Sequence, residues 1–398
     1  MRITQAQIFL SHFSYNMIQI KRNLVPETKI CVPVKADAYG HGAVAIARTA
    51  EQDGADYLAV ASVQEGIELR SAGIGLPILV LSLPAPDELS ELVTAELTAV
   101  VCDMEFAGQL ETTAAALGKT VSVHLKIDTG MGRIGCRPGD AAALARDVSA
   151  LGRLRLSGVC THLSVSDSLR EEDIAWTNLQ IDRFSAAVSA IRDAGIDPGI
   201  VHCANSGAVL LHPRSHFDMV RPGIVLYGYP PEVSSLGRLK DRSPVRDVPP
   251  GYGGALDFLP VMELVTAVSA IKRVCAGEYI SYGRTWQASC DTWIATLPLG
   301  YADGLLRRFV PGLTVLIGEK SYPVVGRICM DQCMVDLGPE TDVERWDRVV
   351  VFGPEKNALS AADIARMTDT IPYEITCGIS KRVPRVYIKE DVCQIFPR

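Results

Sequence analysis

Short apolar runs recur along the chain up to residue 227, and the stretches between them place apolar residues every three or four positions. The runs lie at 29–36, 57–62, 77–82, 97–103, 121–128, 156–163, 200–207 and 219–227. Continuous apolar runs of this length predict strands buried on both faces, and the periodic stretches predict helices. Eight such units in succession favour a (β/α)₈ barrel over an open parallel sheet.

The pattern changes after the eighth run. Residues 231–260 are rich in glycine, proline, serine and charge, which indicates an interdomain linker or excursion. Short strand-like runs separated by turns follow, with one short helical stretch, "SAADIARM", and they predict an antiparallel sandwich or barrel. The expected fold class is therefore α/β plus all-β. An N-terminal strand at 1–10 is expected to join the C-terminal domain, with a (β/α)₈ barrel over 11–230 and a β-strand-rich domain over 261–398.

Composition excludes several classes of protein. The chain has 398 residues, a net charge of −7 and no basic cluster interleaved with aromatic residues, so we expect no nucleic-acid partner. Its most apolar stretch, "IGLPILVLSLPAP", is short and broken by prolines, and no signal-peptide core precedes it; we expect a cytoplasmic protein that does not span a membrane. Eleven cysteines without C-x-x-C pairs favour reduced thiols and no metal site.

The stretch "IDTGMGRIG" (127–135) matches the G-x-G-x-x-G dinucleotide fingerprint. A strand precedes it, but the next helix is expected only at about Asp140, after a Pro-Gly turn. The positive end of that helix is too far from the glycines to hold a pyrophosphate. We therefore interpret the glycines as a turn that brings Arg133 to a ligand.

Polar residues lie at the ends of the predicted barrel strands, where (β/α)₈ enzymes carry their chemistry, and one more lies within the eighth strand. They are Lys35, Lys126, Asp128, His162, Asn205, Ser206 and Arg221. Each alone is compatible with a cap or a loop residue. Together they predict one polar rim at the carboxyl ends of the strands.

The stretch "VPVKADAYGHGA" (32–43) is the most informative. A lysine that closes an apolar strand is half-buried, and burial lowers its pKa and makes its amine a better nucleophile toward an aldehyde. A surface lysine after a strand is the alternative. As a whole, however, the stretch resembles the pyridoxal-phosphate lysine motif of the alanine racemases.

The resemblance extends along nearly the whole chain. Further matching blocks, in the family's order, are "HLKIDTGMGRIG", "THLSVSD", "HCANSGA", "MVRPGIVLYG", "ISYGRTW", "LPLGYADG", "VGRICMDQCMVD" and "IPYEITCGISKRVPRVY". It implies a barrel followed by a β-domain, pyridoxal 5'-phosphate as cofactor, and a head-to-tail homodimer with shared active sites. The N-terminal stretch matches only loosely, and 231–260 is longer than usual in the family.

The resemblance also implies two catalytic bases. Lys35 would hold the cofactor as a Schiff base and act on one face of the substrate, and Tyr282, from the partner subunit, would act on the other. A free tyrosine titrates near pH 10, so Tyr282 needs help from neighbouring groups, which the resemblance assigns to His162 and Arg221. Arg221 would also face the pyridine nitrogen. Because a guanidinium only donates hydrogen bonds, the ring would be a weaker electron sink, which favours racemisation.

The remaining roles concern binding. The phosphate would be held by Tyr39, Ser206, Tyr373 and the amides of Gly223 and Ile224. The substrate carboxylate would meet Arg133 and the amide of Met330, while Tyr301 and Tyr373 narrow the entrance and Arg307 lies nearby. Lys126 resembles a lysine that many members carry as a carbamate, although an ordinary lysine is equally compatible with the sequence.

The expected function is the interconversion of L-alanine and D-alanine, which supplies D-alanine for peptidoglycan. A racemase with serine or broader preference is an alternative, because a hydroxyl is poorly excluded by a small pocket. A basic amino-acid decarboxylase would need an acidic partner at the ring nitrogen, and Arg221 argues against it. A non-enzymatic pyridoxal-phosphate carrier would need neither a second domain nor Tyr282.

Overall fold

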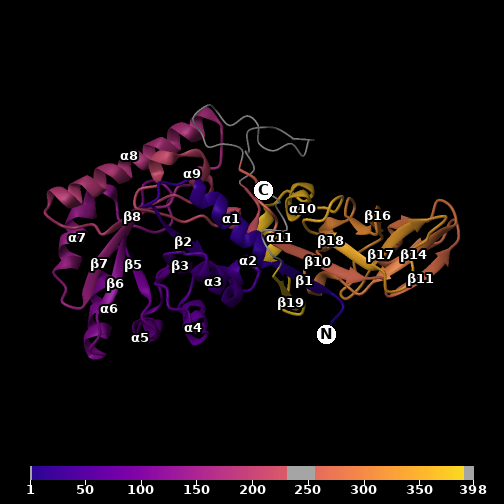
Figure 1. Cartoon of the computed structure of the whole chain (residues 1–398), viewed down its shortest axis with the longest axis horizontal. Helices are drawn as coiled ribbons and strands as arrows, with labels where there is room; N and C mark the ends of the chain where they lie inside the picture. The colour runs from indigo at the N-terminus through magenta and orange to yellow at the C-terminus, as the bar shows by residue number, and fades with distance from the viewer. Residues whose placement is uncertain (1, 231–255, 390–398) are drawn as a thin grey trace.

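The computed structural model describes residues 2–230 and 256–389, and most of the predicted excursion at 231–260 lies outside the described residues. Eight parallel strands close into a barrel, because β9 pairs with β2 (Figure 1). The strands are β2 (Lys29–Pro33), β3 (Tyr57–Val60), β4 (Ile78–Val80), β5 (Thr98–Val101), β6 (Val121–Lys126), β7 (Leu154–Cys160), β8 (Ile200–His202) and β9 (Met219–Val220). The predicted (β/α)₈ barrel is confirmed.

Helices surround the barrel. They are α1 (Leu10–Arg22), α3 (Ala43–Gln52), α4 (Val63–Ser71), α5 (Leu89–Thr94), α6 (Met104–Ala116), α7 (Ala141–Ser149), α8 (Glu171–Asp193) and α9 (Ser206–Leu211). In α3, the buried residues Ala43, Ile46, Ala47 and Ala50 follow the i, i+3, i+4, i+7 spacing of a helix with one apolar face. Among the described residues, no helix combines the length and apolar character needed to cross a bilayer.

Each of the eight barrel strands ends earlier than the apolar run from which it was predicted. The run at 200–207, for example, ends as a strand at His202; Asn205 caps α9 by accepting a hydrogen bond from the Ala208 amide at 3.1 Å. Arg221 likewise lies directly after β9 rather than within it. The predicted ends were wrong because apolar composition reports burial, and the loops after these strands are buried too. Val34 and Val225, for example, are both 0% exposed.

A nine-stranded sheet forms the second part, in the order β11-β14-β17-β16-β15-β18-β10-β1-β19 (Figure 1). Its members are β1 (Gln5–Phe9), β10 (Met262–Ala267), β11 (Ala270–Val274), β14 (Thr292–Leu297), β15 (Thr314–Ile317), β16 (Lys320–Val325), β17 (Cys333–Gly338), β18 (Arg348–Phe352) and β19 (Arg385–Ile388). Neighbours are antiparallel, except that β1 is parallel to β19, where the expectation of a wholly antiparallel sheet was wrong. The N-terminal strand thus lies between the first and the last strand of the second part, β10 and β19.

Two short helices and a small ribbon complete the second part. The helices are α10 (Ala361–Met367) and α11 (Pro372–Cys377), and the ribbon pairs β12 (Tyr279–Ile280) with β13 (Trp286–Gln287). The pattern predicted α10 but not α11. Helix α11 packs against the barrel: a Cβ on Gly40 would lie 2.2 Å from the Thr376 carbonyl oxygen, so only glycine allows this approach.

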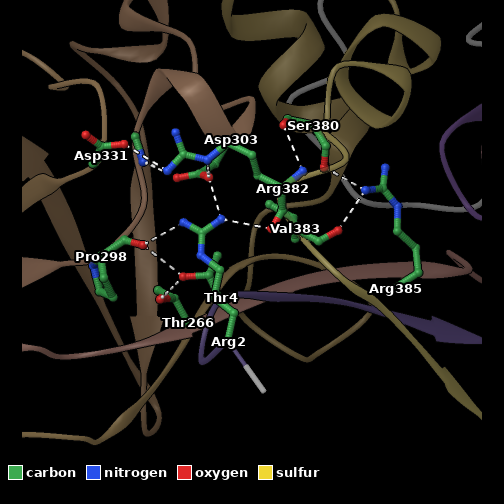
Figure 2. A network of polar contacts seen from close by, with 11 residues as sticks. Arg2, Thr4, Thr266, Pro298, Asp303, Asp331, Ser380, Arg382, Val383 and Arg385 are labelled. Carbon is green, nitrogen blue, oxygen red and sulfur yellow. Dashed lines mark hydrogen bonds and ion pairs between the residues drawn. The ribbon is translucent and has the colours of Figure 1, made fainter.

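A buried carboxylate ties the start of the chain to the second sheet (Figure 2). Asp303 is 0% exposed, and its Oδ1 lies 2.6 Å from an Arg2 guanidinium nitrogen and 3.2 Å from Nε of Arg382. Its Oδ2 accepts a hydrogen bond from the Gly300 amide at 3.0 Å. Arg382 also pairs with Asp331 at 2.8 Å. The network therefore fixes the turn that carries Tyr301 and the residue after Met330.

We expect Asp303→Asn to lower the free energy of unfolding by about 2–4 kcal/mol, because it leaves two guanidinium groups without their buried carboxylate. The arginines are partly exposed, which keeps the expected cost near the lower end. The matched control is Asp342→Asn, whose exposed pair with Lys320 should contribute at most about 1 kcal/mol. Urea unfolding measures both, and equal losses in the two variants would contradict the assigned role.

Candidate active site

A cavity of about 410 Å³ opens at the carboxyl ends of the barrel strands. Its lining is Pro33, Lys35, Tyr39, Ala61, Leu81, Ser82, Leu83, Lys126, Arg133, Ile134, His162, Asn205, Ser206, Arg221, Gly223 and Tyr373. A wider hollow of about 700 Å³ lies at the opposite end of the barrel, beside Lys29, Ile200 and Asp218. The first cavity is the candidate active site, because (β/α)₈ enzymes carry their chemistry at the carboxyl ends of the strands.

The cavity brings together most of the residues predicted for cofactor binding. Nine of the residues to which the family resemblance gives a role line it: Lys35, Tyr39, Lys126, Arg133, His162, Ser206, Arg221, Gly223 and Tyr373. Ile224 is buried next to Gly223. Four others do not line it and lie in the second part of the chain: Tyr282, Tyr301, Arg307 and Met330. The structure of a single chain therefore separates the predicted residues into two groups.

Lys35 lies two residues beyond the end of β2 and begins the short turn α2 (Lys35–Tyr39). Burial lowers the pKa of its amine, and the positive charge of Arg133 lowers it further. The turn is unusual, because its residues from Ala36 to Tyr39 have φ values of 52–54°, in the left-handed region. Glu65 supports it by accepting a hydrogen bond from the Ala36 amide at 2.7 Å. Strained backbone of this kind is concentrated at functional sites.

Arg221 is buried and held by three acceptors. It donates to the carbonyl oxygens of Thr161 at 2.8 Å and Cys203 at 3.1 Å, and to Nδ1 of His202 at 2.6 Å. Because a guanidinium cannot accept a hydrogen bond, Nδ1 of His202 must be the acceptor of the bond from Arg221. The proton of His202 is therefore on Nε2, which donates to Nδ1 of His124, 2.8 Å away. The tautomers of both histidines are thereby fixed.

The two histidines were not predicted. Burial, together with the charge of Arg221, lowers the pKa of His124 to about 3 and that of His202 well below its usual range. Both rings are therefore neutral at physiological pH, and the positive charge at this place belongs to Arg221. His162 lies beside it, with Nδ1 3.5 Å from a guanidinium nitrogen, and its pKa is likewise lowered by burial and by Arg221.

Hydrogen-bond donors converge at the end of the cavity near β9. The Ser206 hydroxyl accepts from the Gly223 amide at 2.8 Å, and a Cβ on Gly223 would lie only 2.9 Å from the Tyr39 hydroxyl. Burial raises the pKa of Tyr39 and of Tyr373, so both phenols stay protonated and can donate. Three hydroxyl groups, of Ser206, Tyr39 and Tyr373, therefore gather beside a glycine-containing backbone turn, and such a donor set suits a phosphate group.

The loop that carries Arg133 is shaped by its glycines and by Asp128. Oδ1 of Asp128 accepts hydrogen bonds from the amides of Gly130, Met131 and Gly132 at 2.9–3.1 Å, and these lower its pKa although burial opposes the shift. A Cβ on Gly135 would lie 2.4 Å from the Asp128 amide nitrogen. The glycines thus serve a tight turn, in agreement with the interpretation from the sequence.

Helix α8 holds the same loop from outside through Gln180, which was not predicted. Its side chain is 0% exposed and accepts a hydrogen bond from the Ser164 amide at 3.0 Å. Its amide nitrogen lies 3.3 Å from the His162 carbonyl oxygen and 3.4 Å from the Thr129 hydroxyl. Gln180 therefore joins the loop of Arg133 to the loop of His162.

Lys126 is a second lysine in the cavity. It is the last residue of β6 and is only 7% exposed. Burial lowers the pKa of its amine to about 8, so a substantial fraction is neutral near physiological pH.

The residues of the second group lie on the surface of this chain. Tyr282 is 70% exposed, Met330 52% and Tyr301 39%. These side chains are therefore accessible from outside the single chain.

Comparison with known proteins agrees with this architecture. Residues 8–231 match the family described as alanine racemase, N-terminal domain, and residues 261–387 match alanine racemase, C-terminal domain. The alanine racemase of Treponema denticola is 49% identical over 98% of this chain and 100% of its own length. That of Treponema pallidum subsp. pallidum is 48% identical over the same shares.

Solved structures give the same result. The alanine racemase of Clostridium difficile 630 superposes with a TM-score of 0.88 at 37% identity, over 98% of this chain and 97% of that one. The alanine racemase of Bacillus anthracis with bound L-Ala-P gives 0.87 at 34% identity, over 98% and 96%. Both halves of the fold, their order and the full length of the relatives are therefore matched, and this chain belongs to the alanine racemase family.

Proposed function

We propose that this chain is an alanine racemase that uses pyridoxal 5'-phosphate, acts in the cytoplasm as a homodimer with shared active sites, and supplies D-alanine for peptidoglycan. The observation that carries the proposal is the content of the barrel cavity. A lysine with a lowered pKa, a buried arginine and a set of donors that suits a phosphate group line the same cavity of about 410 Å³. Membership of the family supports the same activity.

The residues of the cavity fit the cofactor. Tyr39, Ser206, Tyr373 and the amides of Gly223 and Ile224 would hold its phosphate, Arg221 would donate to its ring nitrogen, and Lys35 would attach it. When bound, the cofactor supplies an aldehyde that captures the substrate amine and a ring that spreads the negative charge left at Cα. Because Arg221 would donate without giving up a proton, it would leave the ring nitrogen without a full positive charge, which would favour return of a proton to Cα over decarboxylation.

Racemisation requires proton transfer on both faces of Cα. The Lys35 amine would serve one face, because burial and the charge of Arg133 lower its pKa and so favour the neutral amine that can accept a proton. The partner subunit's Tyr282 serves the other, since Tyr282 does not line the cavity of its own chain and is 70% exposed there. His162 and Arg221, which line the cavity, would support that phenol. Arg133 and the Met330 amide would hold the substrate carboxylate, and Tyr301, Tyr373 and Arg307 would shape the entrance.

Incubation of the purified protein with pyridoxal 5'-phosphate and L-alanine tests this proposal. We expect a visible cofactor absorption band and progressive loss of optical activity until the two enantiomers are equal. A stable band without loss of optical activity would favour a carrier of the cofactor, and release of carbon dioxide would favour a decarboxylase. Serine offered in place of alanine measures the substrate preference.

We further propose that Lys126 carries a carbamate, which would place a negative charge beside Arg133. The neutral amine attacks carbon dioxide, a nitrogen–carbon bond forms, and one proton leaves to solvent. With ¹³C-bicarbonate at fixed total carbonate, we expect a carbamate carbon resonance that grows as the pH rises to about 8 and then levels off. The resonance should be absent in Lys126→Ala and present in Lys119→Ala. Its absence from the wild-type protein at pH 9 would contradict the modification.

A further inference from the structure

The residue before Tyr282 has a backbone conformation that is almost exclusive to glycine. Ser281 has φ 67° and ψ −176°, a region in which any Cβ is strained. Gly283 and Arg284, which follow Tyr282, have φ values of 73° and 48°. Tyr282 is therefore presented by a turn in which three of four residues have positive φ, and one of them is a serine where glycine would be unstrained.

The side chain of Ser281 explains its presence there. Its hydroxyl donates to the carbonyl oxygen of Arg327 at 2.5 Å. The Cys329 sulfur lies 3.7 Å from the same carbonyl and 3.6 Å from the serine hydroxyl. A glycine would remove the strain, but it would also remove this contact.

The two segments that Ser281 joins are also in close backbone contact. A Cβ on Gly326 would lie 2.8 Å from the Ser281 Cβ and 2.8 Å from the Ile280 carbonyl oxygen. In the Tyr282 turn itself, a Cβ on Gly283 would lie 3.1 Å from the Arg327 guanidinium carbon. The turn 281–284 thus fits closely against 326–329, the segment that leads directly to Met330.

We propose that Ser281 is a positioning residue, and that its bond to Arg327 makes the Tyr282 turn and the Met330 segment one rigid unit. This inference rests on the proposed function, in which Tyr282 is a base and the Met330 amide meets the substrate carboxylate. Held together, the phenol and the amide keep a fixed separation, so a substrate bound by its carboxylate has its Cα at a fixed distance from the phenol. The reaction rate is sensitive to this geometry, because misplacement of a reacting group by about 1 Å can lower the rate on the order of 100-fold.

Two variants separate positioning from stability. Ser281→Gly removes both the hydroxyl and the strain, whereas Ser281→Ala removes the hydroxyl and keeps the strain. We expect Ser281→Gly to unfold roughly 2–4 °C above Ser281→Ala, while both racemise alanine about 10- to 100-fold more slowly than the wild-type protein. The control is Ser269→Ala, which loses a comparable bond, from a serine hydroxyl to the Thr296 carbonyl at 2.9 Å, and should keep its activity.

A second readout does not need the reaction. In the protein without cofactor, peptides covering 278–288 should exchange their amide hydrogens faster in both Ser281 variants than in the wild type and in Ser269→Ala. With the loaded enzyme, the deuterium isotope effect should increase for the alanine enantiomer whose Cα proton Tyr282 removes. Wild-type rates in Ser281→Gly together with unchanged hydrogen exchange would overturn the inference. A wild-type protein that does not racemise alanine would overturn the proposed function alone, because the exchange measurement still tests the contact.

Discussion

Lys35→Ala is expected to eliminate the visible band of the bound cofactor and to lower the rate of alanine racemisation by at least about 10⁴-fold. The variant loses the attachment of the cofactor and the base on one face of the substrate together, and the loss of either is severe. Lys35 is suited to both tasks, because burial and Arg133 lower the pKa of its amine. Absorbance between 300 and 500 nm and polarimetry would measure the two losses on one sample.

Two controls make this result specific. Lys119→Ala removes an exposed lysine that pairs with Glu96 on the surface of the barrel, and it should retain both the band and the rate. Lys126 is the only other lysine among the described residues that line the cavity. If Lys35→Ala kept an absorption band, and this band disappeared when Lys126 was replaced as well, the cofactor would be attached to Lys126 and not to Lys35.

Tyr282→Phe is expected to slow racemisation by about 10²- to 10⁴-fold, the usual contribution of a positioned acid or base. The phenol is exposed in the single chain, so its removal should leave the melting temperature nearly unchanged. In deuterium oxide, the enantiomer that presents its Cα proton to Lys35 should still exchange that proton, and the other enantiomer should not. Tyr279→Phe, in the strand that precedes the Tyr282 turn, is the control and should behave like the wild type.

Mixing the two inactive variants tests whether the sites are shared. If Lys35 of one subunit works with the partner subunit's Tyr282, a hybrid dimer of Lys35→Ala and Tyr282→Phe contains one intact site. Random reassociation of equal amounts makes about half of the dimers hybrid, so about a quarter of the wild-type activity should return. If both residues of a site came from the same chain, mixing would restore nothing.

The barrel could be predicted because its strands are apolar on both faces and its helices carry apolar residues every three or four positions. Once the barrel is known, its topology determines which side chains lie together at the carboxyl ends of the strands. Lys35, Lys126, His162, Ser206 and Arg221 lie at or just beyond the ends of different strands, yet they line one cavity because parallel strands end at the same face. Their chemical roles stay predictions. The predicted strand ends were wrong for the same reason that the strands were found, since burial continues into the loops.

Other features carried weaker signals. His124 and His202 lie within apolar strands, where a buried ring nitrogen needs a partner, and this could have indicated their contact with each other and with Arg221. Gln180 is an ordinary polar residue of a helix in the sequence, and only packing shows that it joins two loops. No residue pattern predicts the conformation of Ser281, because serine rarely adopts it.

The place of β1 has a consequence for synthesis. This strand leaves the ribosome before the barrel, but its neighbours β10 and β19 are made after the barrel, and about 250 residues separate β1 from β10. At roughly 5–20 residues per second, β1 waits about 10–50 s with both of its edges unpaired. The barrel can close during this interval, whereas the second sheet cannot be completed until translation is nearly finished. A chain that stalls after the barrel and before β10 would therefore expose an unpaired β1, a ready template for association between nascent chains.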